Sequence, residues 1–372
     1  MYTTAFHLIR SFFRRLLSKP LTRLADKFSS APDKEKVFAS LSDLLQAMRK
    51  GQKDRGPCLT FNPANDRFII FSDEHKGIRD DADDFRKADP NYRSALDYYF
   101  TQGYTFINLG DCEELWENAP GPVMKSNRDC LASEKSFLDA GRYVRIYGNH
   151  DLEWKYQIQQ KAWLVPVFGK ELKVYEGLAL DTVYNGNVYT IFMAHGHQGD
   201  QRSDGNAFSS WFVAAIWTPI QRFLDINVNT PATSFTLTDR HNIMMSEWSA
   251  TQSHLIFISG HTHKPVFASL DHVDVLHREL QMAEKENNAV KMAALNEELS
   301  KRLKEYQGKE QIKTDAKPSY FNSGCCCFDD GDITGIEIAE GEIRLIKWET
   351  QNGKPARLVL EYAPLSYIFD KL

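Results

Sequence analysis

Residues 255–265, LIFISGHTHKP, join a run of apolar, β-favouring residues to a pair of histidines. Gly260 interrupts the run, and His261 and His263 follow it just before a proline. An apolar run of this length, bounded by glycine and proline, predicts a short buried strand. A single histidine after a strand is usually an ordinary core or surface residue. The pair therefore indicates a ligand site only if other strands end in the same way.

Four other stretches share this design, running from β-favouring apolar residues into Asp, Asn or His. They are RFIIFSDEH (67–75), YTFINLGD (104–111), YVRIYGNHD (143–151) and VYTIFMAHGH (188–197). Helix-length segments separate the first three, which predicts a largely parallel inner sheet. Because such sheets bind ligands beyond the carboxyl ends of their strands, the polar residues there mark a site. The C-terminal part favours short strands and tight turns, with AEGE (339–342) as a hairpin signal.

The five predicted strand ends together supply seven side chains of the types that bind metals. These are Asp73, His75, Asp111, Asn149, His195, His261 and His263. Two divalent cations about 3.5–4 Å apart use such a mixture, because one carboxylate can bridge both ions while neutral imidazoles complete each shell. The residues therefore predict a dinuclear metal centre, and a mixed His, Asp and Asn set accepts Mn, Fe or Zn.

The order and approximate spacing of these motifs resemble the calcineurin-like metallophosphoesterase superfamily. The resemblance covers roughly residues 66–349 and rests on Asp-x-His (73–75), GDCEE (110–114), GNHD (148–151), HGH (195–197) and GHTH (260–263). It implies an α/β (α+β) fold, a four-layer α/β/β/α sandwich with helical insertions. It also implies two metal subsites that share one carboxylate: Asp73, His75, Asp111 and His263 in one, and Asp111, Asn149, His195 and His261 in the other.

The same resemblance implies an enzyme, a metal-dependent hydrolase of phosphoric esters. A hydroxide that bridges the two metals would attack phosphorus. His150 would protonate the leaving oxygen, with Asp151 or Asp73 orienting its ring. We expect Glu114 to accept a hydrogen bond from a metal-binding histidine.

Two sets of neighbouring residues leave alternatives open. His197 is the alternative to His195 as a ligand, although the resemblance selects the first histidine of HGH. Several charged residues near the motifs are further candidates for substrate contacts or are simply solvated: Lys76, Asp83, Asp84, Asp200 and Asp204.

The substrate is predicted to be a phosphoester or pyrophosphate, lipid-linked or nucleotide-linked. LGDCEELW (109–116), HGHQGD (195–200) and GHTHKPVF (260–267) resemble the branch of UDP-2,3-diacylglucosamine pyrophosphohydrolase-like proteins, although that branch usually has Arg where this chain has His150. A non-catalytic metal-binding scaffold and a nuclease are the alternatives. We expect no nucleic-acid partner, because the net charge of −5 provides no global basic field.

The remaining segments suggest membrane or subunit contacts. Residues 1–28 predict a basic amphipathic helix, which either lies on an anionic membrane, docks on the protein itself or acts as a transit peptide. A linker and a short helix complete residues 1–56, ahead of a metallophosphoesterase domain at 57–349 and a C-terminal tail at 350–372. The apolar, aromatic insertion at 205–250 could form a cap over the site, a membrane contact, a partner interface or, by default, ordinary core. The charged, helical insertion at 273–311 could form a helical hairpin that packs on the domain or on a second subunit of a homodimer.

The cysteines indicate a reducing compartment, so we expect a cytoplasmic protein, associated with a membrane if the amphipathic helix binds one. Six cysteines are too few and too irregularly spaced for a disulfide framework in 372 residues. Cys325, Cys326 and Cys327 are consecutive, so neighbouring side chains would point apart in a strand. We interpret them as buried strand residues.

Overall fold

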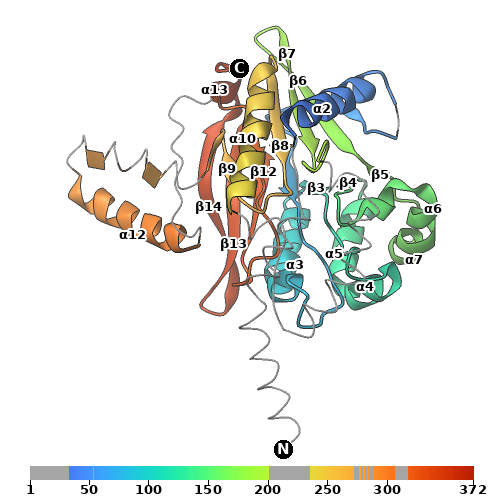
Figure 1. The fold of residues 1–372 in the computed structure, drawn as a ribbon. Helices are drawn as coiled ribbons and strands as arrows, with labels where there is room; N and C mark the ends of the chain where they lie inside the picture. Colours follow the sequence, from blue (N-terminus) through green and yellow to red (C-terminus); the bar gives the residue numbers. More distant parts are fainter. Residues whose placement is uncertain are drawn as a thin grey trace, which may run out of the picture.

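Two seven-stranded β-sheets form the centre of the protein (Figure 1). The computed structural model describes residues 33–52, 54–200, 235–271, 276–277, 280, 283–284, 288–305 and 317–372. The predicted amphipathic helix at 1–28 and residues 205–234 of the apolar insertion lie outside the described residues.

The first sheet combines a parallel half with an antiparallel half. Its strand order is β14 (Lys354–Pro364), β13 (Glu342–Gln351), β12 (Ile333–Ala339), β2 (Phe68–Phe71), β3 (Thr105–Leu109), β4 (Tyr143–Ile146) and β5 (Val174–Tyr175). Strands β2 to β5 pair in parallel, and β12 pairs antiparallel with β2. The AEGE hairpin prediction is confirmed, because Glu340 and Gly341 have positive φ between β12 and β13.

The second sheet holds the other two predicted site strands. Its order is β1 (Cys58–Thr60), β6 (Gly177–Tyr184), β7 (Asn187–Ala194), β8 (Leu255–Ser259), β11 (Tyr320–Asn322), β9 (Val266–Phe267) and β10 (Leu270–Asp271). Strand β8 pairs in parallel with both β7 and β11. The parallel pairing expected from the alternation of strands and helices is therefore divided between the two sheets, each of which has a parallel part.

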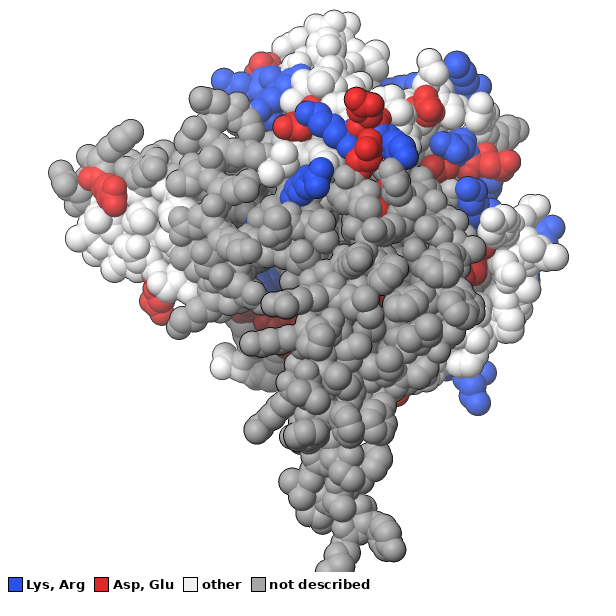
Figure 2. Space-filling view, in the orientation of Figure 1, with Lys and Arg blue, Asp and Glu red and all other residues white. Residues whose placement is uncertain are grey.

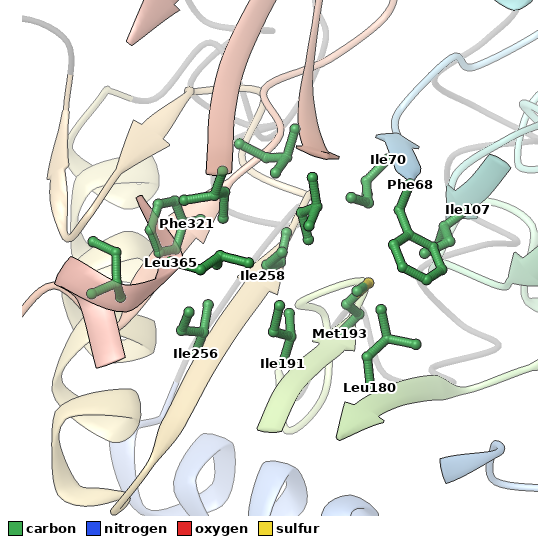
Figure 3. Packing of buried hydrophobic residues seen from close by; sticks show 14 of the residues in the cluster. Phe68, Ile70, Ile107, Leu180, Ile191, Met193, Ile256, Ile258, Phe321 and Leu365 are labelled. Atoms are coloured by element: carbon green, nitrogen blue, oxygen red, sulfur yellow. The ribbon is translucent and has the colours of Figure 1, made fainter. Parts of the chain in front are cut away.

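The main hydrophobic core lies between the sheets (Figure 3). Ile70 and Ile107 from the first sheet face Ile191, Ile256 and Ile258 from the second. Their neighbours in sequence point the other way, since side chains alternate along a strand. Ile69 and Phe71, for example, belong to a different cluster on the outer face of the first sheet.

Helices cover both outer faces and complete the four-layer α/β/β/α sandwich that the sequence predicted. Helices α3 (Phe85–Thr101) and α5 (Arg128–Asp139) pack on the first sheet. Helices α2 (Lys34–Arg49) and α10 (Phe235–Thr251) pack on the second, on the opposite side of the molecule (Figure 1). Helix α2 begins at Asp33, whose side chain accepts a hydrogen bond from the Lys36 amide.

Short helices fill the connections between these elements. They are α4 (Pro120–Ser126), the 3₁₀ turn at Leu152–Lys155, α6 (Gln157–Gln159), the π turn at Gln160–Leu164, α7 (Val165–Phe168) and α13 (Leu365–Phe369). Helix α12 (Ala289–Glu305) lies in the charged insertion and projects away from the sheets in Figure 1. Leu276 and Leu299 pack together there, which agrees with a helical hairpin.

Residues 350–372 do not form a tail. Strand β14 pairs with β13 along its length, and α13 packs Leu365 and Ile368 into the core between the sheets. An Asn-Gly turn at 352–353, with positive φ at both residues, joins the two strands. Among the helices in the described part of the chain, none has the length and apolar character needed to span a membrane.

Candidate metal centre

The five motif-bearing strands end at one place, although they come from two sheets. Backbone hydrogen bonds join the loops directly: the Asp73 amide donates to the Gly110 carbonyl, and the Gly260 amide donates to the His195 carbonyl, at 3.0 and 2.9 Å. The His261 amide donates to the Asp73 carboxylate at 3.0 Å and so ties the end of β8 to the end of β2. All seven predicted ligand residues are buried within this junction.

The first predicted subsite forms a compact group around His75 and His263. Their Nε2 atoms lie 3.0 Å apart. Asp73 Oδ1 lies 3.3 Å from His263 Nε2, and Asp111 Oδ2 lies 3.7 Å from His75 Nε2. The structure therefore brings together all four residues of this subsite.

The second predicted subsite lies beside it and shares Asp111. His195 Nε2 lies 3.0 Å from Asp111 Oδ2, and the His261 ring is 5.3 Å from the His195 ring, centroid to centroid. Asp111, His195 and His261 offer ligand atoms that all lie within 4.8 Å of one another. Asn149 follows β4 at the same junction, where its Oδ1 is buried without a hydrogen-bond partner.

The hydrogen bonds of two histidines show that this site fits a cation. His195 Nδ1 lies 2.8 Å from the Leu109 carbonyl oxygen, so Nδ1 carries a proton, and in the neutral ring Nε2 presents its lone pair to Asp111. His75 Nδ1 is held in the same way, 2.9 Å from Glu114 Oε2. Lone pairs and carboxylate oxygens that face one another repel unless a positive charge lies between them.

The pKa shifts of the same residues have the same cause. Burial lowers the pKa of His195, but the charges of Asp111 and Asp73 outweigh burial and raise that pKa to about 10. Burial raises the pKa of Asp111, yet His195 and His150 hold it well below its usual range. Both shifts show that this arrangement of side chains favours positive charge at the junction.

Most of the ligands are held in a backbone conformation that side chains other than glycine rarely adopt. Positive φ angles, from 48° to 69°, are found at five of them: Asp73, His75, Asp111, His261 and His263. Each such residue costs on the order of 1–2 kcal/mol, and strain of this kind concentrates at functional sites. The sharp turns aim successive polar side chains into the junction.

His150 lies at the edge of the centre, and Glu114 orients its ring. The two oxygens of Glu114 lie 2.9 and 2.8 Å from His150 Nδ1, while His150 Nε2 is buried without a partner. Trp116 stacks on the same ring at 4.1 Å and donates from Nε1 to the Asn149 carbonyl. Glu114 thus contacts both His75 and His150, whereas sequence analysis expected one histidine and missed Trp116.

The expected roles of Asp151 and Lys76 differ from what the structure contains. The Asp151 carboxylate accepts hydrogen bonds from the amides of Cys112 and Gly148, at 2.9 and 2.6 Å, so it orders the loops and does not orient the His150 ring. The Asp73 carboxylate accepts hydrogen bonds from Ser72 and the His261 amide, so Glu114 and not Asp73 orients the His150 ring. Lys76 is fully buried and pairs with Glu134 of α5 at 2.9 Å, so its charge is already matched by a carboxylate inside the protein.

Helix α10 adds a residue that no motif indicated. His241 Nε2 donates to the Gly196 carbonyl at 2.9 Å, and its ring lies 5.0 Å from the His261 ring. The alternative ligand His197 lies 5.5 Å from His195 between ring centroids, on the side of Tyr147. Asp204 and residues 208–217 of the predicted cap lie outside the described residues, whereas Trp248 of the same insertion is buried against the second sheet.

Comparisons with known proteins show only a distant likeness. No protein-family model matches the chain, and no curated protein matches its sequence. Vacuolar protein sorting 29 from Cryptosporidium parvum aligns in structure with a TM-score of 0.33 and 12% identity, over 80% of this chain and 98% of that one. A single mutant of Vps29 from Entamoeba histolytica has a TM-score of 0.28 and 14% identity, over 79% and 98%. With TM-scores this low, the function is argued from the site itself.

Proposed function

We propose that this chain is a metal-dependent phosphoesterase whose centre takes two divalent cations of the Mn, Fe or Zn type. The observation that carries the proposal is the pair of histidines, His75 and His195, whose Nε2 lone pairs face the carboxylates of Asp73 and Asp111. When bound, such cations neutralise phosphoryl oxygens and lower the pKa of a coordinated water from about 15.7 towards 7.

The protein's own residues would divide the remaining work. Asp111 Oδ2 lies within 4 Å of both His75 and His195, which suits a carboxylate shared between two ions. His150 would act on the leaving oxygen through Nε2, because Glu114 occupies Nδ1 and fixes the ring. This assignment makes His150 the residue that moves a proton.

The substrate class rests on more limited support. We propose a phosphoric ester or pyrophosphate, lipid-linked or nucleotide-linked, on the resemblance of the motifs to the UDP-2,3-diacylglucosamine pyrophosphohydrolase branch. A nuclease is less favoured: on the face drawn in Figure 2, the described Lys and Arg side chains lie among Asp and Glu side chains. Membrane association through residues 1–28, a homodimer through the insertions and a cytoplasmic location remain predictions.

The direct test is hydrolysis by the purified chain with Mn²⁺, on a panel of aryl phosphate monoesters, diesters and pyrophosphates, with and without dispersed lipid. Asp111→Asn keeps the side-chain shape but removes the shared charge, so we expect turnover to fall by about 10³-fold or more. Asp97→Asn, on the exposed face of α3, is the matched control and should leave turnover unchanged.

Two results would count against the proposal. Fully metallated wild-type protein that hydrolyses no substrate of the panel would favour the non-catalytic metal-binding scaffold. Hydrolysis that survives Asp111→Asn would place the chemistry elsewhere in the chain.

A further inference from the structure

Two of the three consecutive cysteines lie beside the metal centre with their thiols on one side. Cys327 Sγ lies 3.9 Å from His263 Nδ1, and Cys325 lies beside both residues. Cys325, Cys327 and His263 are buried, with 1%, 4% and 8% of their surfaces exposed. Their ligand atoms lie within 4.8 Å of one another.

The loop that holds these cysteines is built onto the end of β2. The Cys326 amide donates to the Asp73 carbonyl at 3.2 Å, and the Cys325 amide donates to Thr334 Oγ1 at 3.3 Å. Gly324 turns the chain with φ of +76°, where a Cβ atom would lie 2.0 Å from Thr334 Oγ1. The position of the two thiols is therefore imposed by the same junction that positions Asp73.

We propose that Cys325, Cys327 and His263 Nδ1 form a third metal site, selective for a thiophilic cation such as Zn²⁺ or Cd²⁺. This site goes beyond the proposed phosphoesterase centre, which uses the opposite nitrogen of His263. Ligand atoms about 2.0–2.3 Å from a tetrahedral ion lie roughly 3.3–3.8 Å apart, so the observed group needs only a small contraction.

The net charge of the site and the soft character of thiolate sulfur both favour a thiophilic divalent cation. On binding, each thiol releases its proton to solvent, so two thiolates and a neutral imidazole hold a divalent cation in a site of zero net charge, which suits burial. The nearby carboxylates of Asp84 and Asp73 add negative charge around Cys327. The same negative surroundings attract a cation. Thiolate ligands select soft or borderline ions over Mg²⁺ or Mn²⁺.

His263 connects the two sites. Its Nε2 lies 3.3 Å from Asp73 Oδ1 in the phosphoesterase centre, and its Nδ1 faces the thiols. An ion bound at Nδ1 makes Nε2 of the same ring a weaker ligand. A thiophilic cation at the third site should therefore weaken binding of Mn²⁺ at the neighbouring subsite. Binding linkage makes this effect reciprocal.

Cadmium titration of the reduced, full-length protein tests the site by a signal that does not depend on hydrolysis. With excess Mg²⁺ present to compete for oxygen ligands, one equivalent of Cd²⁺ should produce thiolate-to-metal charge-transfer absorption. Each of Cys325→Ser and Cys327→Ser removes one of the two thiolates, so we expect roughly half of the absorbance or less to remain. Cys326→Ser is the matched control, because its thiol points to the helix side and contacts the Thr334 carbonyl.

X-ray absorption of the cadmium-loaded wild type removes any dependence on how well the variants fold. Two sulfur neighbours around cadmium would support the site. No sulfur neighbour, or equal absorbance losses in all three serine variants, would overturn it. Since neither readout requires turnover, this proposal and the phosphoesterase proposal can fail separately.

Discussion

Two buried polar clusters lie on opposite sides of the β2–β3–β4 strand ends, and they balance their charges differently. On the helix side, Arg145 pairs with Glu113, and Lys76 pairs with Glu134, all fully buried. Trp154 and Tyr143 donate to the same two carboxylates, each at 2.8 Å. This ion-pair cluster thus contains its own cations.

Among the described residues, the ion pairs recorded for Asp73 and Asp111 in the metal centre are with histidines. Its carboxylates face imidazole nitrogens whose other ring atoms are already committed to Leu109 and Glu114. Neither cluster satisfies every polar atom, since Arg145 Nε and His261 Nε2 both lack hydrogen-bond partners. The difference is the source of the positive charge. In the ion-pair cluster Lys76 and Arg145 supply it, whereas in the metal centre we propose that bound cations do.

The largest expected effect on stability comes from removing a cation from the ion-pair cluster. Arg145→Met leaves Glu113 buried without its partner, so the free energy of unfolding should fall by about 3–5 kcal/mol. Urea denaturation of the metal-free protein measures this loss. Arg93→Met, which breaks a partly exposed pair with Asp89, should cost about 0.5 kcal/mol or less. Equal losses in the two variants would erase the distinction between the clusters.

Metal removal should affect only the other cluster. At a free Mn²⁺ concentration 100 times the dissociation constant, each bound ion adds about 2.7 kcal/mol to the free energy of unfolding. Chelation should therefore lower the thermal midpoint of the wild type and, by a similar increment, of Arg145→Met. Asp111→Asn should respond much less. An equally large response in Asp111→Asn would show that the ions bind elsewhere.

The smallest predicted effect concerns Glu114, which orients the histidines of the centre without facing the cations itself. Glu114→Gln leaves one oxygen to serve both His75 and His150, so Mn²⁺ affinity or turnover should fall by about 10–100-fold. Metal titration and steady-state kinetics measure the two quantities. Glu171→Gln, at an exposed position, should change neither. If Glu114→Gln also leaves Mn²⁺ affinity and turnover unchanged, the orientation of the His75 and His150 rings by Glu114 does not contribute to either quantity.

Sequence reasoning found the cluster of candidate metal ligands because each of them lies shortly after a strand. The apolar run and the polar tip are local features, and all five runs proved to be strands: β2, β3, β4, β7 and β8. Their division between two sheets is a tertiary property that no single segment encodes. Asn-Gly pairs at 185–186 and 352–353 were a local signal for the β6–β7 and β13–β14 hairpins. Had the Asn-Gly pair at 352–353 been interpreted as a hairpin turn, residues 350–372 would have been predicted as part of the sheet and not as a tail.

The supporting residues were harder to find, because packing alone brings them to the site. His241 reaches the centre on α10, and Trp116 reaches His150 from the loop after β3. Neither follows a strand, and neither has a spacing that marks it. The buried position of Lys76 is also invisible in a sequence, since its partner Glu134 lies on α5, 58 residues along the chain.

The positive φ angles at the proposed ligand residues lower the stability of the fold but position the side chains for metal binding. Glycine would relax the backbone at Asp73 or His261 without steric penalty. The same change would delete a ligand. Random substitution screened only for thermal tolerance of the metal-free chain would thus tend to accept glycine at these turns and abolish metal binding. A library intended to improve this protein should be selected with the metal present.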